Sequence, residues 1–252
     1  MLPIKDENQT CHLTFVVYII IALNILSWIF LQGFGLEPLL SKSVCRFGAI
    51  PGDLLGLVKV GTQVQIAPGM ACVVDGRPDW ITVLTSMFMH GGWFHILGNM
   101  WFLFIFGDNV EDALGPFRFL IFYLLCGIAA VAAQMAASPA SPIPMVGASG
   151  AIGGVMGAYA VTFPRSRVHM LVFFGFFFTR IVVPAFLMLG YWFILQVLGG
   201  MLGGEDGGVA FWAHIGGFAA GIILVFLLRN RRRLDECRAS RSVAGRMFQR
   251  YR

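Results

Sequence analysis

Charged residues are scarce in this chain. They make up 12% of its 252 residues, about half the share of a soluble domain. Hydrophobic residues make up 58% and form continuous runs, whereas a transmembrane barrel needs alternating segments of about ten residues. Because every backbone polar group in lipid must be satisfied internally, helices are the remaining way to span a bilayer. The composition therefore predicts an all-α membrane protein.

Six hydrophobic runs are near the length of about 20 residues that a membrane-spanning helix needs. They are Phe15–Leu31, Trp93–Val110, Phe117–Ala137, Ser149–Phe163, Val182–Leu202 and Val209–Leu228. The fourth is short, as expected of a helix that begins below the membrane surface. The first is too long for a signal peptide and has no cleavage site after it, so we expect a retained span. Val168–Phe178 either lies in the interface or begins a kinked fifth span, and both readings leave six crossings.

Basic residues are few along most of the chain and concentrate at its C-terminus, where residues 229–252 hold nine of the 18. A basic segment directly after a hydrophobic run indicates the cytosolic side of a membrane. Six crossings then place both termini in the cytosol. We expect a six-helix domain over residues 1–229, with a long external loop at about 33–92, and a basic cytosolic tail over 230–252. Without an aromatic platform beside the arginines, nucleic acid is not an expected partner.

Cysteines number only five. Cys45 and Cys72 both lie in the predicted external loop, where an oxidising compartment would allow a disulfide. The sequence leaves that bond open. The other three, Cys11, Cys126 and Cys237, are interpreted as free thiols. Because no metal-ligand spacing is found, we expect neither a metal nor an organic cofactor.

Few polar side chains interrupt the hydrophobic runs, and the most notable lie near the N-terminal ends of the second, fourth and sixth. They are His95, Asn99, Ser149 and His214. These three helices would enter the membrane from the same face, so the four side chains would meet at one depth. Polar and ionisable groups in lipid are costly, and they indicate a functional site by default.

Ser149 lies between glycines, in Gly147-Ala148-Ser149-Gly150, where a helix is expected to begin. It is either a helix cap or a nucleophile beside free backbone N–H groups. His214 is either a buried structural residue or the general base of that serine. Small residues on both helices permit the close approach that the second reading needs. No carboxylate falls in the apolar interior of a span, so a hydrolase here would use a Ser–His dyad.

His95 and Asn99 are four residues apart and share one helix face. The Asn99 amide could donate to an oxyanion, and removing such a donor typically lowers a rate by about 10²–10³. It could equally form a hydrogen bond between helices. The spacing does not decide between the two readings.

Three motifs together resemble those of the rhomboid family of intramembrane serine proteases. They are Gly-Ala-Ser-Gly at 147–150, Ala-His-Ile-Gly-Gly at 213–217, and His-Gly-Gly-Trp-Phe-His at 90–95 with Asn99 one turn later. Their order and spacing match over roughly residues 12–229. The resemblance implies a six-transmembrane-helix bundle of the rhomboid type.

The resemblance also implies roles for single residues. Ser149 would be the nucleophile, His214 the general base, and His95, Asn99 and the Ser149 backbone N–H the oxyanion hole. Further residues match positions that look structural: His90, Glu111, Gly147, Gly150 and Gly217. Two positions depart from what family members show: Ile81 stands where the family often has an arginine, and Gly153 stands where some members have a tyrosine that stacks on the histidine.

We therefore expect hydrolysis of a peptide bond in or next to a transmembrane segment of membrane-protein substrates within the lipid bilayer. The fifth helix and the Gly203–Gly208 loop are the expected gate. The resemblance implies a bacterial plasma (inner) membrane, with the active site opening to the external face, and leaves the oligomeric state open. The alternative is a non-catalytic rhomboid-like protein that binds membrane clients. A channel or transporter would need polar groups across the whole bilayer, whereas here they cluster near one face.

Overall fold

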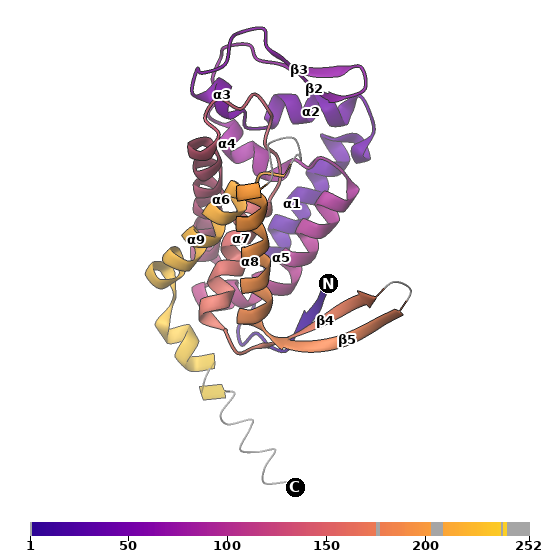
Figure 1. The fold of residues 1–252 in the computed structure, drawn as a ribbon. Helices are drawn as coiled ribbons and strands as arrows, with labels where there is room; N and C mark the ends of the chain where they lie inside the picture. The colour runs from indigo at the N-terminus through magenta and orange to yellow at the C-terminus, as the bar shows by residue number, and fades with distance from the viewer. Residues whose placement is uncertain (1, 175–176, 203–208, 238, 241–252) are drawn as a thin grey trace, which may run out of the picture.

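A bundle of long helices forms the body of the molecule (Figure 1). The computed structural model describes residues 2–174, 177–202, 209–237 and 239–240. The long helices are α1 (Val16–Phe30), α5 (Trp93–Leu114), α6 (Pro116–Ala137), α7 (Ser149–Thr162), α8 (Ala185–Leu202) and α9 (Phe211–Leu228). Each corresponds to one predicted hydrophobic run, so the mostly helical fold is confirmed.

Three of these helices, α6, α8 and α9, are long and apolar enough to cross a membrane by length and composition. Helices α1 and α7 are shorter, with 15 and 14 residues. Helix α5 has 22 residues, but its last turns carry Asp108, Glu111 and Asp112. The short α7 agrees with the expectation of a helix that starts inside the bundle.

Two small sheets correct the expectation of an all-α fold. Strands β1 (Leu2–Asp6), β4 (Arg167–Phe174) and β5 (Phe177–Pro184) form an antiparallel sheet in the order β1-β4-β5, and β2 (Gln63–Ala67) pairs with β3 (Met70–Val73).

The hairpin of β4 and β5 also shows that the kinked fifth span was wrong, because α8 begins only at Ala185. Val168, Met170 and Val172 are buried, while the residues between them are more exposed. This alternation is the pattern of a strand with one covered face. The high apolar content of the segment concealed it.

Helix α7 lies at the centre of the bundle and packs against α5, α6, α8 and α9. Ten of its 14 residues are buried, which explains why it carries no charge. Its contact with α9 is a contact of backbones. A Cβ atom on Gly217 would overlap the carbonyl oxygen of Gly150, and one on Gly221 would overlap that of Gly154. Only glycine allows this approach.

The long loop between α1 and α5 is folded and covers one end of the bundle (Figure 1). It contains η1 (Gly33–Gly35), α2 (Leu39–Phe47), α3 (Pro51–Leu54), β2, β3, α4 (Thr82–Thr85) and η2 (Ser86–Phe88). A disulfide between Cys45 and Cys72 ties α2 to β3. This bond answers the question that the sequence left open.

The opposite end of the bundle carries the N-terminal strand, the β4–β5 hairpin and the start of the C-terminal segment (Figure 1). There Cys11 and Cys237 are bonded to each other, so their interpretation as free thiols was wrong; Cys126 is free and buried. The two bonded residues are 226 positions apart, so only the tertiary fold brings them together.

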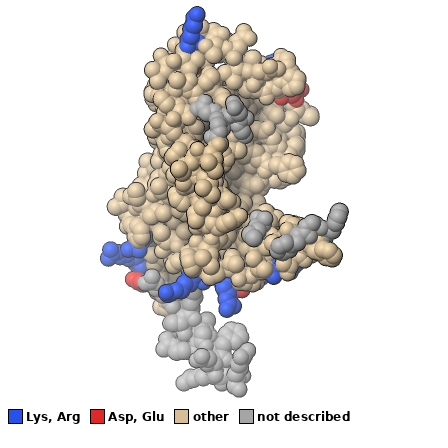
Figure 2. Space-filling view, in the orientation of Figure 1, with Lys and Arg blue, Asp and Glu red and all other residues tan. Residues whose placement is uncertain are grey.

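Lys and Arg side chains gather at this second end, while the middle of the molecule shows none of them in the view of Figure 2. An uncharged girdle between charged ends is the surface expected of a membrane protein. Much of the predicted basic tail, residues 241–252, lies outside the described residues.

Candidate active site

Ser149 is the first residue of α7, as predicted. The chain reaches it through Gly147, whose φ of +126° is a conformation that favours glycine. The backbone N–H of Gly147 donates to the carbonyl oxygen of Ser86 (2.9 Å), which anchors this approach to η2. Ser149 therefore sits where the chain enters the bundle, with the unpaired N–H groups of the first helical turn next to it.

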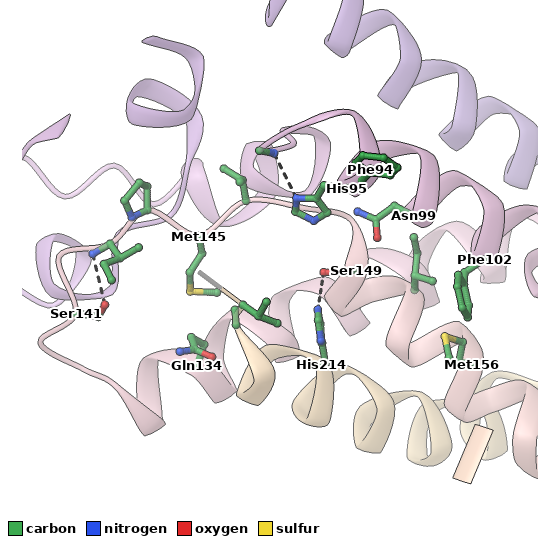
Figure 3. A pocket seen from close by; sticks show the side chains of 18 of the residues that line it. Phe94, His95, Asn99, Phe102, Gln134, Ser141, Met145, Ser149, Met156 and His214 are labelled. Atoms are coloured by element: carbon green, nitrogen blue, oxygen red, sulfur yellow. Dashed lines mark hydrogen bonds between the residues drawn. The ribbon is translucent and has the colours of Figure 1, made fainter. Parts of the chain in front are cut away.

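His214, one turn into α9, faces Ser149 (Figure 3). The distance from Ser149 Oγ to His214 Nε2 is 2.8 Å. The close packing of Gly217 on Gly150 sets this distance, because it fixes how near the two helix ends lie. The predicted convergence of the two residues is thus present in the structure.

His95 and Asn99 project from α5 toward the same pocket (Figure 3). His95 Nδ1 accepts a hydrogen bond from the Gly91 N–H at 3.3 Å. A Cβ atom on Gly147 would lie 2.6 Å from His95 Nε2, so the glycine also makes room for this ring beside the serine.

The Asn99 amide is buried, and its Nδ2 has no hydrogen-bond partner among the described residues. Leaving a buried donor unpaired costs about 1–3 kcal/mol. A donor held in this way at the wall of a cavity is available to a ligand that enters. The alternative role of Asn99 is to donate a hydrogen bond to another helix. Among the described residues, its Nδ2 has no such acceptor.

Two residues of α8 complete the surroundings of His214, and the sequence analysis missed both. Gln196 Oε1 lies 2.8 Å from His214 Nδ1. The Trp192 ring is tilted by 37° against the imidazole, with 5.8 Å between centroids. Trp192 also covers Gly153, the position at which a tyrosine of some family members was noted in the sequence. An amide inside a hydrophobic run was the signal that could have pointed to Gln196.

A cavity of about 440 Å³ opens beside the serine and the histidine. Its polar groups come from His95, Asn99, Gln134, Ser141, Ser149 and His214, and most of the rest of its wall is apolar, with Phe94, Phe102, Ile152, Met156 and Trp192 among its members. An apolar cavity with few convergent polar groups is the usual form of a ligand site. The loop predicted to gate it, residues 203–208, lies outside the described residues.

The His90 ring packs against the ring of His95. The two rings meet edge to face, with centroids 5.1 Å apart. The side chain of Gln32 holds the backbone of His90, accepting from its N–H (2.8 Å) and donating to its carbonyl oxygen (2.7 Å). Burial, with a smaller effect of His95, lowers the pKa of His90 to about 3, so this ring is neutral near pH 7. The contacts agree with a structural role.

Glu111 lies far from the site, at the other end of α5. Its carboxylate accepts hydrogen bonds from the backbone N–H groups of Phe15, Val16 and Val17 at 2.8–3.0 Å. A negative charge at a helix N-terminus is stabilising. Glu111 thus caps α1, which is also a structural role.

Comparison with known proteins finds the family model described as "Rhomboid domain" over residues 77–231. This range contains the four polar residues of the pocket that the sequence singled out: His95, Asn99, Ser149 and His214. A relative is "Rhomboid-like protein 11, chloroplastic" from Arabidopsis thaliana, 32% identical over 162 residues. The match covers 60% of this chain and 53% of the relative, so the chain spans about half the length of the curated relative it matches.

Proposed function

Because the chain belongs to the rhomboid family, we propose that it is an intramembrane serine protease that cleaves membrane proteins in or next to a transmembrane segment. The observation that carries the proposal is the 2.8 Å contact between Ser149 Oγ and His214 Nε2 at the wall of a cavity. A serine next to a base is the arrangement that activates a hydroxyl for attack on a carbonyl.

In the proposed reaction, Ser149 Oγ attacks the carbonyl carbon of the scissile peptide and His214 Nε2 takes the hydroxyl proton. The negative charge that develops on the carbonyl oxygen is stabilised by Asn99 Nδ2, by His95 and by the Ser149 backbone N–H. His214 then gives its proton to the leaving amine, and the C–N bond breaks. His214 then takes a proton from water, whose oxygen attacks the resulting ester, and returns that proton to Ser149 Oγ as the ester bond breaks.

Gln196 holds the imidazole in the tautomer that this mechanism needs. Its Nε2 donates to the backbone oxygen of Trp192 at 3.3 Å, which leaves Oε1 facing His214 Nδ1. A carbonyl oxygen can only accept, so Nδ1 carries the hydrogen and Nε2 is free to take a proton from Ser149. In catalytic triads a carboxylate has this task.

We also propose six membrane crossings, with both termini in the cytosol and the catalytic cavity opening to the external side. The proposal is supported by the described basic residues near the second end of the bundle, among them Arg118, Arg165, Arg229 and Arg233, because cytosolic loops carry an excess of Lys and Arg. The division into a domain over 1–229 and a tail over 230–252 stays a prediction. So does a bacterial plasma membrane. The Arabidopsis relative is named as a chloroplastic protein, and this location is a property of the relative.

The competing function is a rhomboid-like protein that binds membrane clients without cleaving them. It requires neither the Ser149–His214 contact nor an unpaired donor beside it. The arrangement of these groups around one cavity favours the protease.

The test is cleavage of a single-span substrate by the full-length protein in liposomes, compared with Ser149→Ala and His214→Ala. Cleavage by the wild type and loss in both variants supports the proposal. Activity that persists in either variant contradicts the mechanism. Where no substrate is cleaved, a fluorophosphonate probe decides: labelling of Ser149 that depends on His214 supports a nucleophile, and its absence in folded protein favours the client-binding function.

A further inference from the structure

A second group of reactive side chains lies at the end of the bundle opposite the external loop. Three segments meet there: the chain before α1, the last turns of α5, and a helical stretch at residues 231–237. The Cys11 and Cys237 sulfurs and a carboxylate oxygen of Asp112 all lie within 4.8 Å of one another. The sequence showed no ligand spacing because these residues are more than 100 positions apart.

The surroundings of Asp112 hold its carboxylate in place. Oδ2 accepts from the Cys11 N–H at 2.8 Å and lies 3.9 Å from Cys237 Sγ. Oδ1 lies 2.6 Å from His12 Nδ1 and 3.4 Å from an Arg233 nitrogen. Hydrogen bonds to a ligating carboxylate are typical of metal sites and orient the ligand.

The chemistry of the two cysteines depends on the side of the membrane. Cys45 and Cys72 are bonded at the external end, where oxidising conditions preserve a disulfide. Cys11 and Cys237 are also bonded in the structure, but the proposed topology places them in the reducing cytosol. There a dithiol reductant cleaves the bond, becoming a disulfide itself and leaving two thiols.

Two thiols beside a buried carboxylate match the ligands of zinc, which binds Cys sulfur at about 2.3 Å and carboxylate oxygen at about 2.0–2.2 Å. Around a tetrahedral ion of this kind, two sulfurs lie about 3.7 Å apart. Cys11 is exposed and lies outside the helices, so a small shift of its segment provides that separation. A cavity of about 100 Å³ lined by Asp112, Arg233 and Cys237 gives access to the cluster.

We propose that Cys11, Asp112 and Cys237 bind one Zn²⁺ on the cytosolic face, with water as the fourth ligand, and so fasten the C-terminal segment to α5 and the N-terminus. The inference uses the proposed topology but not the proteolytic activity. Binding of Zn²⁺ releases the two thiol protons. The two thiolates and the carboxylate then carry three negative charges, and the zinc ion carries two positive charges. The Arg233 guanidinium neutralises the remaining negative charge.

The test is zinc content and affinity of the full-length protein, purified in detergent with a phosphine reductant and with its affinity tag removed. We expect one zinc per chain by mass spectrometry of the metal, and a thiolate-to-cobalt absorption band after replacement by Co²⁺. Cys11→Ser and Cys237→Ser should lose both signals. Asp112→Asn should bind more weakly, and His12→Ala should weaken binding about 10–100-fold.

Cys126→Ser is the matched control, because its thiol is buried in α6 away from the cluster, and it should retain the zinc. Reduced wild type without zinc, or cluster variants that keep it, would overturn the proposal. So would a Cys11–Cys237 disulfide that persists in protein taken from the cytosol without a reductant. The wild-type stoichiometry decides the question even if a variant fails to fold. Because no readout uses substrate, failure here is separate from failure of the protease assignment.

Discussion

Gln196 Oε1 accepts a hydrogen bond from His214 Nδ1 at 2.8 Å, on the side of the ring away from Ser149. The two residues belong to different helices, α8 and α9. The proposed base is therefore held by the helix that we also expect to form part of the gate. A displacement of α8 would remove both Gln196 and the Trp192 ring from His214.

Gln196→Met keeps the length of the side chain but removes the acceptor. A neutral hydrogen bond contributes about 1 kcal/mol, which corresponds to a loss in kcat of about fivefold to tenfold. We expect KM to stay the same, since the side chain acts through His214. The measurement is steady-state cleavage together with the rate of fluorophosphonate labelling of Ser149. Leu195→Met, at a half-exposed neighbouring position of α8, should leave both rates unchanged; a Gln196→Met enzyme as fast as this control would contradict the positioning role.

Asn99→Ala separates the two roles that the sequence left open. As an oxyanion donor, Asn99 should contribute about 10²–10³ in kcat, and its loss should not lower stability because Nδ2 has no partner to lose among the described residues. Asn109→Ala is the contrast on the same helix, since its Nδ2 is bonded to Asp6 and Asp108. It should lower the thermal midpoint and spare kcat. If Asn99→Ala instead lowered stability with little effect on kcat, Asn99 would be an interhelical contact.

Gly217→Ala and Gly221→Ala should force α9 away from α7, because each new methyl group would overlap a backbone carbonyl of the facing helix. Overpacking of this kind costs about 1–3 kcal/mol. Gly217→Ala should in addition slow Ser149 labelling, since it widens the contact next to His214. Gly190→Ala, where nothing lies within 4 Å, is the control and should be neutral. Thermal unfolding in detergent measures the effect, and equal midpoints for all three variants would show that the backbones are not in contact.

Glu111→Ala should destabilise the fold without changing the chemistry of the site. It leaves three backbone N–H groups at the start of α1 without their acceptor, and loss of a charged cap costs roughly 2 kcal/mol or more. The folded fraction should keep the kcat of the wild type. Glu7→Ala, an exposed carboxylate beside His169, should have little effect on stability. A drop in kcat for folded Glu111→Ala would mean that this residue reaches the site.

The helices could be predicted closely from the sequence because continuous apolar runs leave few alternatives in lipid. The start of α7 at Ser149 and the starts of α5 and α6 lie within one residue of the prediction. The β4–β5 hairpin could not be predicted in this way. Most of its residues are apolar, including several exposed ones such as Phe173, Phe177 and Phe178, so hydropathy alone does not separate a strand from the beginning of a helix.

The sequence predicted that four polar side chains would meet at the site, and all four line one cavity: Ser149, His214, His95 and Asn99. The reason is geometric: the direction of each helix sets the depth of its polar group, and glycine sets the distance between helices. Gln196 and Trp192 were missed because their role depends on how α8 is rotated about its axis. The pairing of Cys11 with Cys237 could not be predicted from sequence spacing either, because the two residues are 226 positions apart.

The sequence by itself determined that this is a helical membrane protein and which polar groups lie near the N-terminal ends of their helices, because hydrophobic length and order along the chain set the position of each group along its helix. Only the tertiary structure decided which side chains of neighbouring helices face each other. The rotation of each helix about its own axis, and the helices that it contacts, depend on packing between segments that are distant in the sequence. That packing places Gln196 against His214, and Cys11 and Asp112 against Cys237.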